Sequence, residues 1–403
     1  MSAPRTGRPA DLGGLRDLLW PAPARTTLGR SRAPGRPSAE YLLVPGADRP
    51  KLIIPAPRRA AAAAVTGFNA ERSPRAAAAS RVLRAGLRTG AAHPMLRDRL
   101  RVYTDDQGAE TIETHLAGVL GTRPLLGLRL GPARANRKPV AQILTPDGHT
   151  TGFTKISVNE LTGALVTAEA RALALLGRAA TRVMTVPTVR YTGRWRGLEL
   201  LTLDALPVWR RRAPVTWDRL TDVMLEIAGI DGGEVAPLTA TPYWKRLNAD
   251  AAALGDTPRA GRVRHALDLL GAHDPRLAFG AWHGDFALWN LAVQPDTVLV
   301  WDWERFATGV PRGYDALHYH FFSDATATRR VPHAVAIGET LDAAPRLLTP
   351  FGHDDGAHVP VALLYLCEIA IRYLRDRQDE AGAPAGRVEE WLLPELLGRA
   401  ERL

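Results

Sequence analysis

The segment 283–290, which reads His-Gly-Asp-Phe-Ala-Leu-Trp-Asn, constrains this chain more than any other part of its sequence. It follows an apolar run at 277–282 that is typical of a strand. An aspartate carboxylate can accept the proton of an attacking hydroxyl, and an asparagine amide oxygen can bind Mg²⁺ without adding negative charge near phosphates. We therefore interpret Asp285 as a candidate catalytic base and Asn290 as a candidate Mg²⁺ ligand.

A second acidic segment, Val-Leu-Val-Trp-Asp-Trp-Glu, follows at 298–304. Its aspartate, Asp302, ends an apolar run seventeen residues after Asp285. An aspartate at a strand end can hold Mg²⁺ over the same cleft and neutralise charge on phosphate oxygens. Alone, Asp302 could be an ordinary turn residue, but at this distance from the first segment we interpret it as a second metal ligand.

Together, His-Gly-Asp-Phe-x-x-Trp-Asn and Val-Trp-Asp-Trp-Glu resemble the catalytic and metal-binding segments of the aminoglycoside phosphotransferase and choline kinase group. These proteins are relatives of protein kinases that phosphorylate small molecules. The resemblance covers roughly residues 122–380 and is sharp between 280 and 320. It implies ATP and Mg²⁺ as cofactors, Asp285 as the base, His283 as an orienting residue and Asp315 as a brace of the catalytic loop. A buried, hydrogen-bonded histidine is the alternative for His283, and the two interpretations nearly coincide.

The resemblance further implies a phosphate-binding lysine on the third strand of a small lobe, held by a glutamate on a helix. Lys155 lies on the strand expected at 151–156 and is one of only four lysines among 52 Lys and Arg residues. Where arginine is the usual cation, a lysine indicates a need for a compact charge. Glu169 is the predicted partner, and Glu160 is its competitor.

The loop at 131–139 would cover the phosphates, and Gly131 and Asn136 are its predicted nucleotide-binding residues. This loop departs from the glycine-rich loop of protein kinases because it has one glycine where that loop has three. Arg134 and Lys138 could contact the phosphates directly, but surface charge is the preferred interpretation of both.

The hydrophobic pattern and the resemblance together predict an α+β chain with a two-lobed protein-kinase-like fold. We expect a small, strand-rich N-lobe at 122–206 and a larger helical C-lobe at 207–403. Residues 39–121, with a hairpin and helices, are predicted to form an N-terminal accessory module. Residues 1–38 are rich in Arg, Pro, Ala and Gly and are predicted to be a flexible basic segment with a short helix at 12–20.

Positive charge is concentrated at the start of the chain. Residues 1–100 hold 18 Lys and Arg against 6 Asp and Glu, whereas residues 101–403 hold 34 against 36. A basic face there could bind a protein partner, nucleic acid or anionic lipid, although arginine being the usual cation of this chain is the preferred explanation. No nucleic-acid motif occurs in the sequence, which argues against a nucleic-acid partner.

Apolar runs in the sequence are too short to cross a bilayer, and the first residues do not resemble a secretory signal. The single cysteine, Cys367, excludes an internal disulfide and lies in an apolar helical pattern typical of a core residue. We therefore expect a soluble, cytoplasmic protein.

The predicted acceptor is a hydroxyl of a small molecule, either a sugar-containing compound or a biosynthetic metabolite. Two alternatives remain open, namely a catalytically silent pseudokinase or scaffold and a kinase of peptidyl Ser or Thr. His318 and His320 suggest a metal pair, although two histidines alone are a weak signal. A polycationic acceptor would need clustered carboxylates near the base, for which the candidates are Glu304, Asp324, Glu368 and Asp376.

Overall fold

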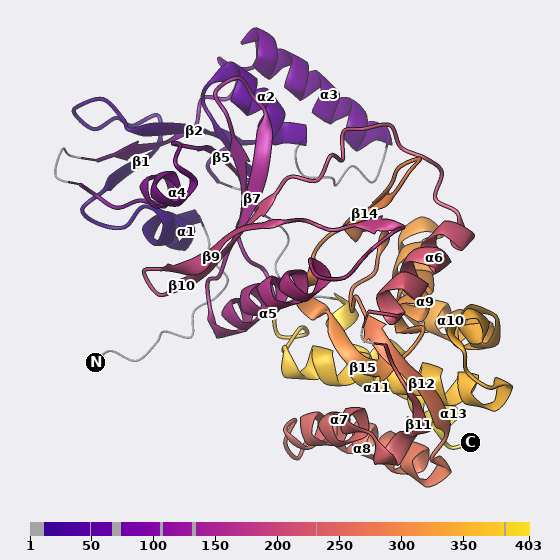
Figure 1. Ribbon diagram of the computed structural model, residues 1–403. Helices are drawn as coiled ribbons and strands as arrows, with labels where there is room; N and C mark the ends of the chain where they lie inside the picture. Colours follow the sequence, from indigo (N-terminus) through magenta and orange to yellow (C-terminus); the bar gives the residue numbers. More distant parts are fainter. Residues whose placement is uncertain are drawn as a thin grey trace. The chain divides into compact units, whose positions relative to one another are not determined.

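Figure 1 shows the computed structural model of the chain, which describes residues 12–48, 50–66, 74–104, 108–130, 134–230, 232–382 and 384–403. The chain is an α+β protein that divides into a strand-rich unit and a larger, mainly helical unit, as the sequence predicts. Unit 1 spans Met1–Pro132, Arg137–Thr167 and Thr188–Leu206, and unit 2 spans Ala133–Asn136, Ala168–Pro187 and Pro207–Leu403.

Unit 1 is built on one nine-stranded sheet with the order β1–β4–β2–β3–β5–β6–β7–β10–β9. All neighbouring strands in this sheet are antiparallel. The strands are β1 (Arg25–Gly29), β2 (Ala39–Val44), β3 (Leu52–Pro55), β4 (Arg99–Tyr103), β5 (Leu125–Arg129), β6 (Val140–Leu144), β7 (Thr150–Ile156), β9 (Val189–Trp195) and β10 (Leu198–Asp204).

Helices cover both faces of this sheet because successive residues of a strand point to opposite faces. Leu42 and Ile54 pack against α2 and α3 on one face, whereas their neighbours Leu43 and Ile53 pack against α1 and α4 on the other. Figure 1 shows the two helix pairs on opposite sides of the strands. The four helices are α1 (Leu12–Leu19), α2 (Arg58–Thr66), α3 (Pro74–Thr89) and α4 (Ile112–Leu120).

The predicted accessory module and the predicted N-lobe share this sheet. Strand β3 pairs with β5, with Leu52 opposite Arg129 and Ile53 opposite Leu128. This pairing satisfies backbone N–H and C=O groups of β5 that would otherwise form an open sheet edge. The strands of residues 39–121 and, except for β8 (Met184–Thr185), those of residues 122–206 therefore belong to one compact unit.

Part of the segment that composition assigned to a flexible region is regular structure. The short helix predicted at 12–20 is present as α1, and β1 follows it, where no strand was predicted. Leu15 and Leu19 of α1 are buried. The difference arises because the apolar side of this short helix packs on the sheet, a tertiary contact that composition does not report.

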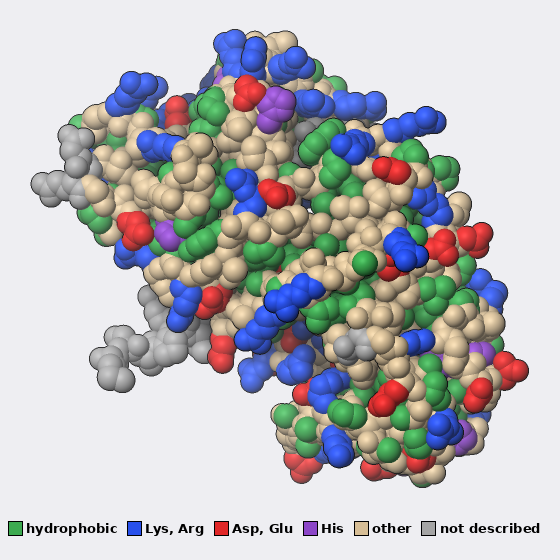
Figure 2. Space-filling model, in the orientation of Figure 1, with side chains coloured by type: hydrophobic (Ala, Val, Ile, Leu, Met, Phe, Trp, Pro, Cys, Tyr) green, Lys and Arg blue, Asp and Glu red, His purple; other side chains and the backbone are tan. Residues whose placement is uncertain are grey.

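Basic side chains accumulate on one helix of unit 1. The sequence of α3 contains arginines and no acidic residue, and Figure 2 shows Lys and Arg side chains gathered over this part of the surface. The excess of positive charge in the first quarter of the sequence is thus partly displayed on α3.

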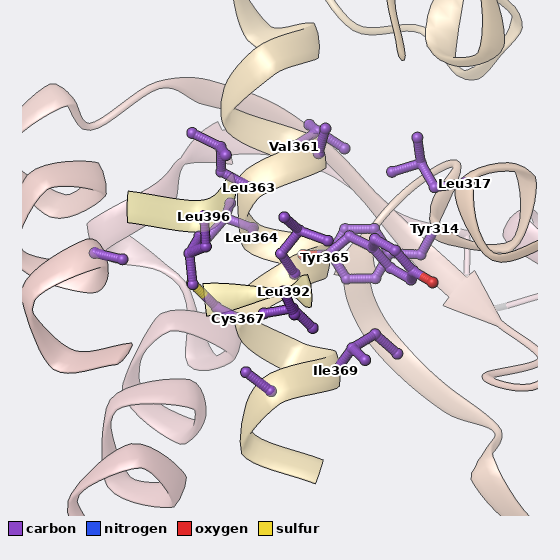
Figure 3. Close-up of a cluster of buried hydrophobic side chains, with 14 of the residues drawn as sticks. Tyr314, Leu317, Val361, Leu363, Leu364, Tyr365, Cys367, Ile369, Leu392 and Leu396 are labelled. Carbon is purple, nitrogen blue, oxygen red and sulfur yellow. The ribbon is translucent and has the colours of Figure 1, made fainter. Parts of the chain in front are cut away.

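Helix α11 (His358–Arg375) is the centre of the core of unit 2. Figure 3 shows Tyr314 and Leu317 of α9, and Leu392 and Leu396 near the end of the chain, packed around Tyr365 and its neighbours. Cys367 is buried in this core, as the sequence predicts. Among the described residues, only the helical stretch Asp355–Arg375 is long and apolar enough to span a membrane, and 78% of its apolar window is buried in the protein.

Most of the remaining elements of unit 2 are helices. A π-helical segment, Tyr319–Thr328, continues α9. Helix α5 (Glu160–Leu176) starts in unit 1 and ends in unit 2. The other helices are α6 (Trp217–Ala228), α7 (Pro242–Ala252), α8 (Pro258–His273), α9 (Tyr314–His318), α10 (His333–Leu348), α12 (Val388–Trp391) and α13 (Leu393–Ala400).

Two small sheets of unit 2 carry the segments that the sequence singled out. In the first, β12 lies between β11 and β15, and in the second, β14 lies between β13 and β8. The loop 283–290 connects the two sheets. The strands are β8 (Met184–Thr185), β11 (Val235–Pro237), β12 (Arg276–Trp282), β13 (Leu291–Val293), β14 (Val298–Val300) and β15 (Ala307–Pro311).

A buried carboxylate in unit 1 provides a test of the accessory module. Glu113 is 3% exposed and accepts hydrogen bonds from Trp20 Nε1, at 2.8 and 2.9 Å, and from the Tyr41 hydroxyl. Glu113→Ala leaves both donors buried without their acceptor, so we expect the free energy of unfolding to fall by about 2 kcal/mol or more. Urea unfolding of this variant beside Glu110→Ala, whose side chain is half exposed, checks this. Equal losses in the two variants would show that the buried network contributes nothing.

Candidate functional site

The loop 283–290 is held by a buried carboxylate on α9. Asp315 accepts hydrogen bonds from the backbone N–H of His283 at 2.7 Å and of Gly284 at 3.2 Å. Burial raises the pKa of Asp315 to about 7, although these two N–H groups and nearby Arg372 act to lower it. Arg372 of α11 also donates to the Gly284 carbonyl oxygen at 2.6 Å. Two helices therefore fix the start of the loop, and Asp315 lies where a brace is predicted.

His283 connects this loop to the segment after β14. Its Nδ1 accepts from the Asp285 N–H at 3.1 Å, so its Nε2 carries the proton and donates to the Trp301 carbonyl oxygen, also at 3.1 Å. Burial lowers the pKa of His283 to about 4, which keeps the ring neutral at physiological pH. His283 is fully buried, and its two hydrogen bonds hold the loop from the interior of the protein.

Asp285 is the partly exposed carboxylate of the loop, with 33% of its side chain accessible. Its Oδ2 accepts from Asn290 Nδ2 at 2.8 Å, and its Oδ1 lies 3.1 Å from His318 Nε2. Burial acts to raise the pKa of Asp285, but the hydrogen bond from His318 acts to lower it, and the pKa lies below its usual value. The carboxylate is therefore ionised and fixed at both oxygens.

The far end of the loop is positioned by two further contacts. The N–H of Leu288 donates to Ser323 Oγ at 2.8 Å, and Ser323 lies in the π-helical segment that follows α9. The hairpin of β13 and β14 pairs Leu291 with Val300, and the Trp301 N–H donates to the Asn290 carbonyl oxygen at 3.0 Å. Strand pairing thus places Asn290 and the residue before Asp302 side by side.

Asp302 lies in an acidic cluster of unit 2. Its backbone has φ 72° and ψ 54°, a left-handed conformation that is uncommon outside glycine and recurs at functional sites. Oxygens of Glu169, Asp302 and Glu304 all lie within 4.8 Å of one another. An all-oxygen set with carboxylates fits a hard cation such as Mg²⁺. Asn136 also approaches, with its Nδ2 at 3.5 Å from Glu304 Oε1.

The structure describes the predicted lysine, Lys155, but only part of the predicted phosphate loop. Lys155 lies on β7, is 8% exposed, and faces Val140 and Leu201 on the neighbouring strands. Because Lys155 belongs to unit 1 and Glu169 to unit 2, their pairing stays a prediction. Gly131 lies outside the described residues.

The predicted acceptor carboxylates are mostly engaged by arginines. Asp376 pairs with Arg305, Glu368 with Arg246 at 2.8 Å, and Asp324 with Arg329 at 3.4 Å. The fourth carboxylate belongs to the acidic cluster. The four side chains therefore do not form a common free anionic surface.

The two histidines suggested as a metal pair have separate partners. His318 contacts Asp285 and the Tyr365 hydroxyl, whereas His320 Nδ1 lies 2.9 Å from Thr340 Oγ1. Both residues lie in continuous helical structure, where side chains two positions apart point in different directions. No sequence pattern predicted the contact of His318 with Asp285, and only the position of His318 three residues after Asp315 pointed towards the loop.

Comparisons with known proteins give low similarities. No protein-family model and no curated protein matches the chain. A protein from Thermobifida fusca assigned as a fructosamine-3-kinase is 19% identical, with a TM-score of 0.43 over 73% of this chain and 100% of its own. Aminoglycoside phosphotransferase APH(4)-Ia, solved as a thermostable mutant with ADP and hygromycin B, is 16% identical, with a TM-score of 0.44 over 72% and 97%. An amicoumacin kinase solved with AMP-PNP and Ca²⁺ is 13% identical, with a TM-score of 0.40 over 68% and 87%.

These similar structures are kinases by name, and one is an aminoglycoside phosphotransferase, the group that the motifs resemble. Identities and TM-scores of this size assign no role to a single residue. The chemistry of the site therefore has to follow from the contacts of Asp285, Asn290 and Asp302.

Gly284 tests how tightly the loop is built. It has φ +83°, and a Cβ there would lie 2.2 Å from the Arg305 carbonyl oxygen. Gly309 has φ +65° with nothing within 4 Å of the same position, so it is a matched control for backbone strain. We expect Gly284→Ala to lower the free energy of unfolding by about 2 kcal/mol more than Gly309→Ala, as measured by urea unfolding. Equal losses would mean that the loop can move away from Arg305.

Asp315 gives the fold a pH dependence. Its folded pKa of about 7 lies above the usual value of about 4 in an unfolded chain, so its protonated form stabilises the fold. This stabilisation is fully present below the unfolded pKa and is lost as the pH rises through the folded pKa. We therefore expect the stability of the wild type relative to Asp315→Asn to decrease between about pH 5 and pH 8. Exposed Asp296→Asn is the control, and a constant difference would contradict the raised pKa.

Proposed function

We propose that this chain is an ATP- and Mg²⁺-dependent phosphotransferase that moves the γ-phosphate to a hydroxyl of a small molecule. The observation that carries the proposal is the state of Asp285, an ionised, one-third exposed carboxylate fixed by Asn290 and His318. An oriented carboxylate of this kind can accept a hydrogen bond from an acceptor hydroxyl and take its proton as the oxygen attacks phosphorus.

Asn290 and Asp302 are the proposed metal ligands. The amide nitrogen of Asn290 donates to Asp285, so its amide oxygen is the atom left to bind a cation. Asp302 would provide a carboxylate oxygen, with Glu169 and Glu304 close to the same point. Mg²⁺ bound there would neutralise charge on the phosphate oxygens. Lys155 and Asn136 are the proposed nucleotide-binding residues from the small lobe and the phosphate loop.

The contacts of the carboxylates favour a neutral or weakly charged acceptor. A polycation needs anionic groups that are not already neutralised, yet three of the four candidates form ion pairs with Arg305, Arg246 and Arg329. A sugar-containing or biosynthetic metabolite with a free hydroxyl fits this arrangement better than a polyamine sugar does. The Arg305–Asp376 pair is buried, so breaking it would leave an uncompensated charge, whereas the exposed pair of Asp324 with Arg329 is weak.

Phosphate transfer can be tested with a panel of hydroxyl compounds, ATP and Mg²⁺, using mass spectrometry to find the addition of one phosphate. We expect Asp285→Ala to lower the rate by about 10²- to 10⁴-fold while the thermal shift by ATP and Mg²⁺ is kept. Asp302→Ala should lose the Mg²⁺-dependent part of that shift. Exposed Asp296→Ala is the control and should match the wild type. Wild-type activity in both site variants would refute the assignment.

The same experiment separates the alternatives. A pseudokinase would bind the nucleotide but transfer no phosphate to any compound, and Asp285→Asn would change nothing. A kinase of peptidyl Ser or Thr would phosphorylate a peptide panel and leave the small molecules unmodified.

A further inference from the structure

His318 contacts the proposed base Asp285 from helix α9. It is the last residue of α9, and its side chain is 3% exposed. Its Nε2 lies 3.1 Å from Asp285 Oδ1, and its Nδ1 lies 3.1 Å from the Tyr365 hydroxyl on α11. Both ring nitrogens thus have partners, and one of these partners is the carboxylate that would take the acceptor proton.

The direction of these hydrogen bonds follows from the groups themselves. An ionised Asp285 can only accept, so the His318 proton must be on Nε2, and a neutral ring then accepts at Nδ1. Burial lowers the pKa of His318, although Asp285 acts to raise it, and burial keeps the pKa of Tyr365 well above its usual value. Tyr365 therefore donates to His318, which donates to Asp285.

We propose that His318, held by Tyr365, is a positioning residue that fixes the carboxylate of Asp285 for its acceptor. His318 holds Oδ1 from α9, while Asn290 holds Oδ2 from the other end of the loop. Rotation of the carboxylate would break the hydrogen bonds from His318 and from Asn290. The remaining lone pairs of the two oxygens, which would accept the proton, therefore keep a fixed direction. Fixing a reacting group in this way contributes to rate through orientation. This inference rests on the proposed function and adds a residue to it.

A buried histidine with a purely structural role is present two residues away and serves as the control. His320 is 9% exposed, and the partner of its side chain is the hydroxyl of Thr340 on α10 instead of the loop 283–290. Losing the ring at either position removes buried contacts, so both changes lower thermal stability. Only the loss of His318 should also alter catalysis in the molecules that remain folded.

The kinetic test compares His318→Leu, His318→Gln and Tyr365→Phe with His320→Leu, each normalised to the fraction that binds ATP and Mg²⁺. We expect His318→Leu to lower kcat by about 10- to 100-fold with an unchanged KM for ATP. His318→Gln keeps a side-chain N–H near the position of Nε2 and should recover most of kcat. Tyr365→Phe should lower kcat less, and should have no further effect in a His318→Leu background. Wild-type kcat in folded His318→Leu would overturn the proposal.

A second measurement does not depend on turnover. In ¹⁵N-histidine-labelled protein, the signals lost in His318→Gln identify His318, and we expect its neutral ring to be protonated at Nε2, with a downfield proton that shifts in Asp285→Asn. Protonation at Nδ1, or no response to Asp285→Asn, would overturn the proposed hydrogen bond. If the wild type transfers no phosphate, the proposed function fails, while this spectrum still decides whether His318 holds Asp285.

Discussion

The acceptance of two consecutive backbone N–H groups by Asp315 is the interaction on which the candidate site depends. A buried carboxylate with this geometry fixes the direction in which the chain leaves β12. Arg372 fixes the next group along the chain, the carbonyl oxygen of Gly284, which directly precedes Asp285. The cost of burying the carboxylate is visible in its raised pKa. Helices α9 and α11 are anchored in the core of unit 2. Through the hydrogen bonds of Asp315 and Arg372, this core therefore restricts the movement of the loop that carries Asp285.

Strand pairing and a neutral histidine then join the base to the acidic cluster. The β13–β14 hairpin sets Asn290 beside Trp301, and His283 bonds the Trp301 carbonyl from the other side. Asp302 follows directly, in a left-handed conformation. A backbone strain of this kind, of about 1 to 3 kcal/mol, persists only where surrounding contacts determine it. The loop that carries Asp285 holds Trp301, the residue before Asp302, through both its N–H and its carbonyl oxygen.

The nine-stranded sheet includes strands from the first 121 residues. The described part of these residues is joined to the following strands by β-pairing and by apolar cores on both faces, so both parts belong to unit 1. Removing the accessory strands would expose an edge of β5 and uncover apolar side chains. These residues share one sheet with β7, the strand that holds Lys155. A change that unfolds them would therefore also disturb the position of Lys155.

Sequence alone singled out Asp285, Asn290 and Asp302 as candidates, through their spacing after an apolar strand and the family resemblance of that pattern, and the structure places Asp285 and Asn290 in hydrogen-bond contact. The sequence also predicted strands β7 and β12, helix α1 and the buried state of Cys367, since these depend on local periodicity. The fold was needed to show that α1 packs on the sheet, that β1 is a strand, that β3 joins β5, and that α9 and α11 bring His318, Tyr365 and Arg372 to the loop. These are contacts between residues far apart in the chain, set by packing geometry, and no local pattern of side chains encodes them.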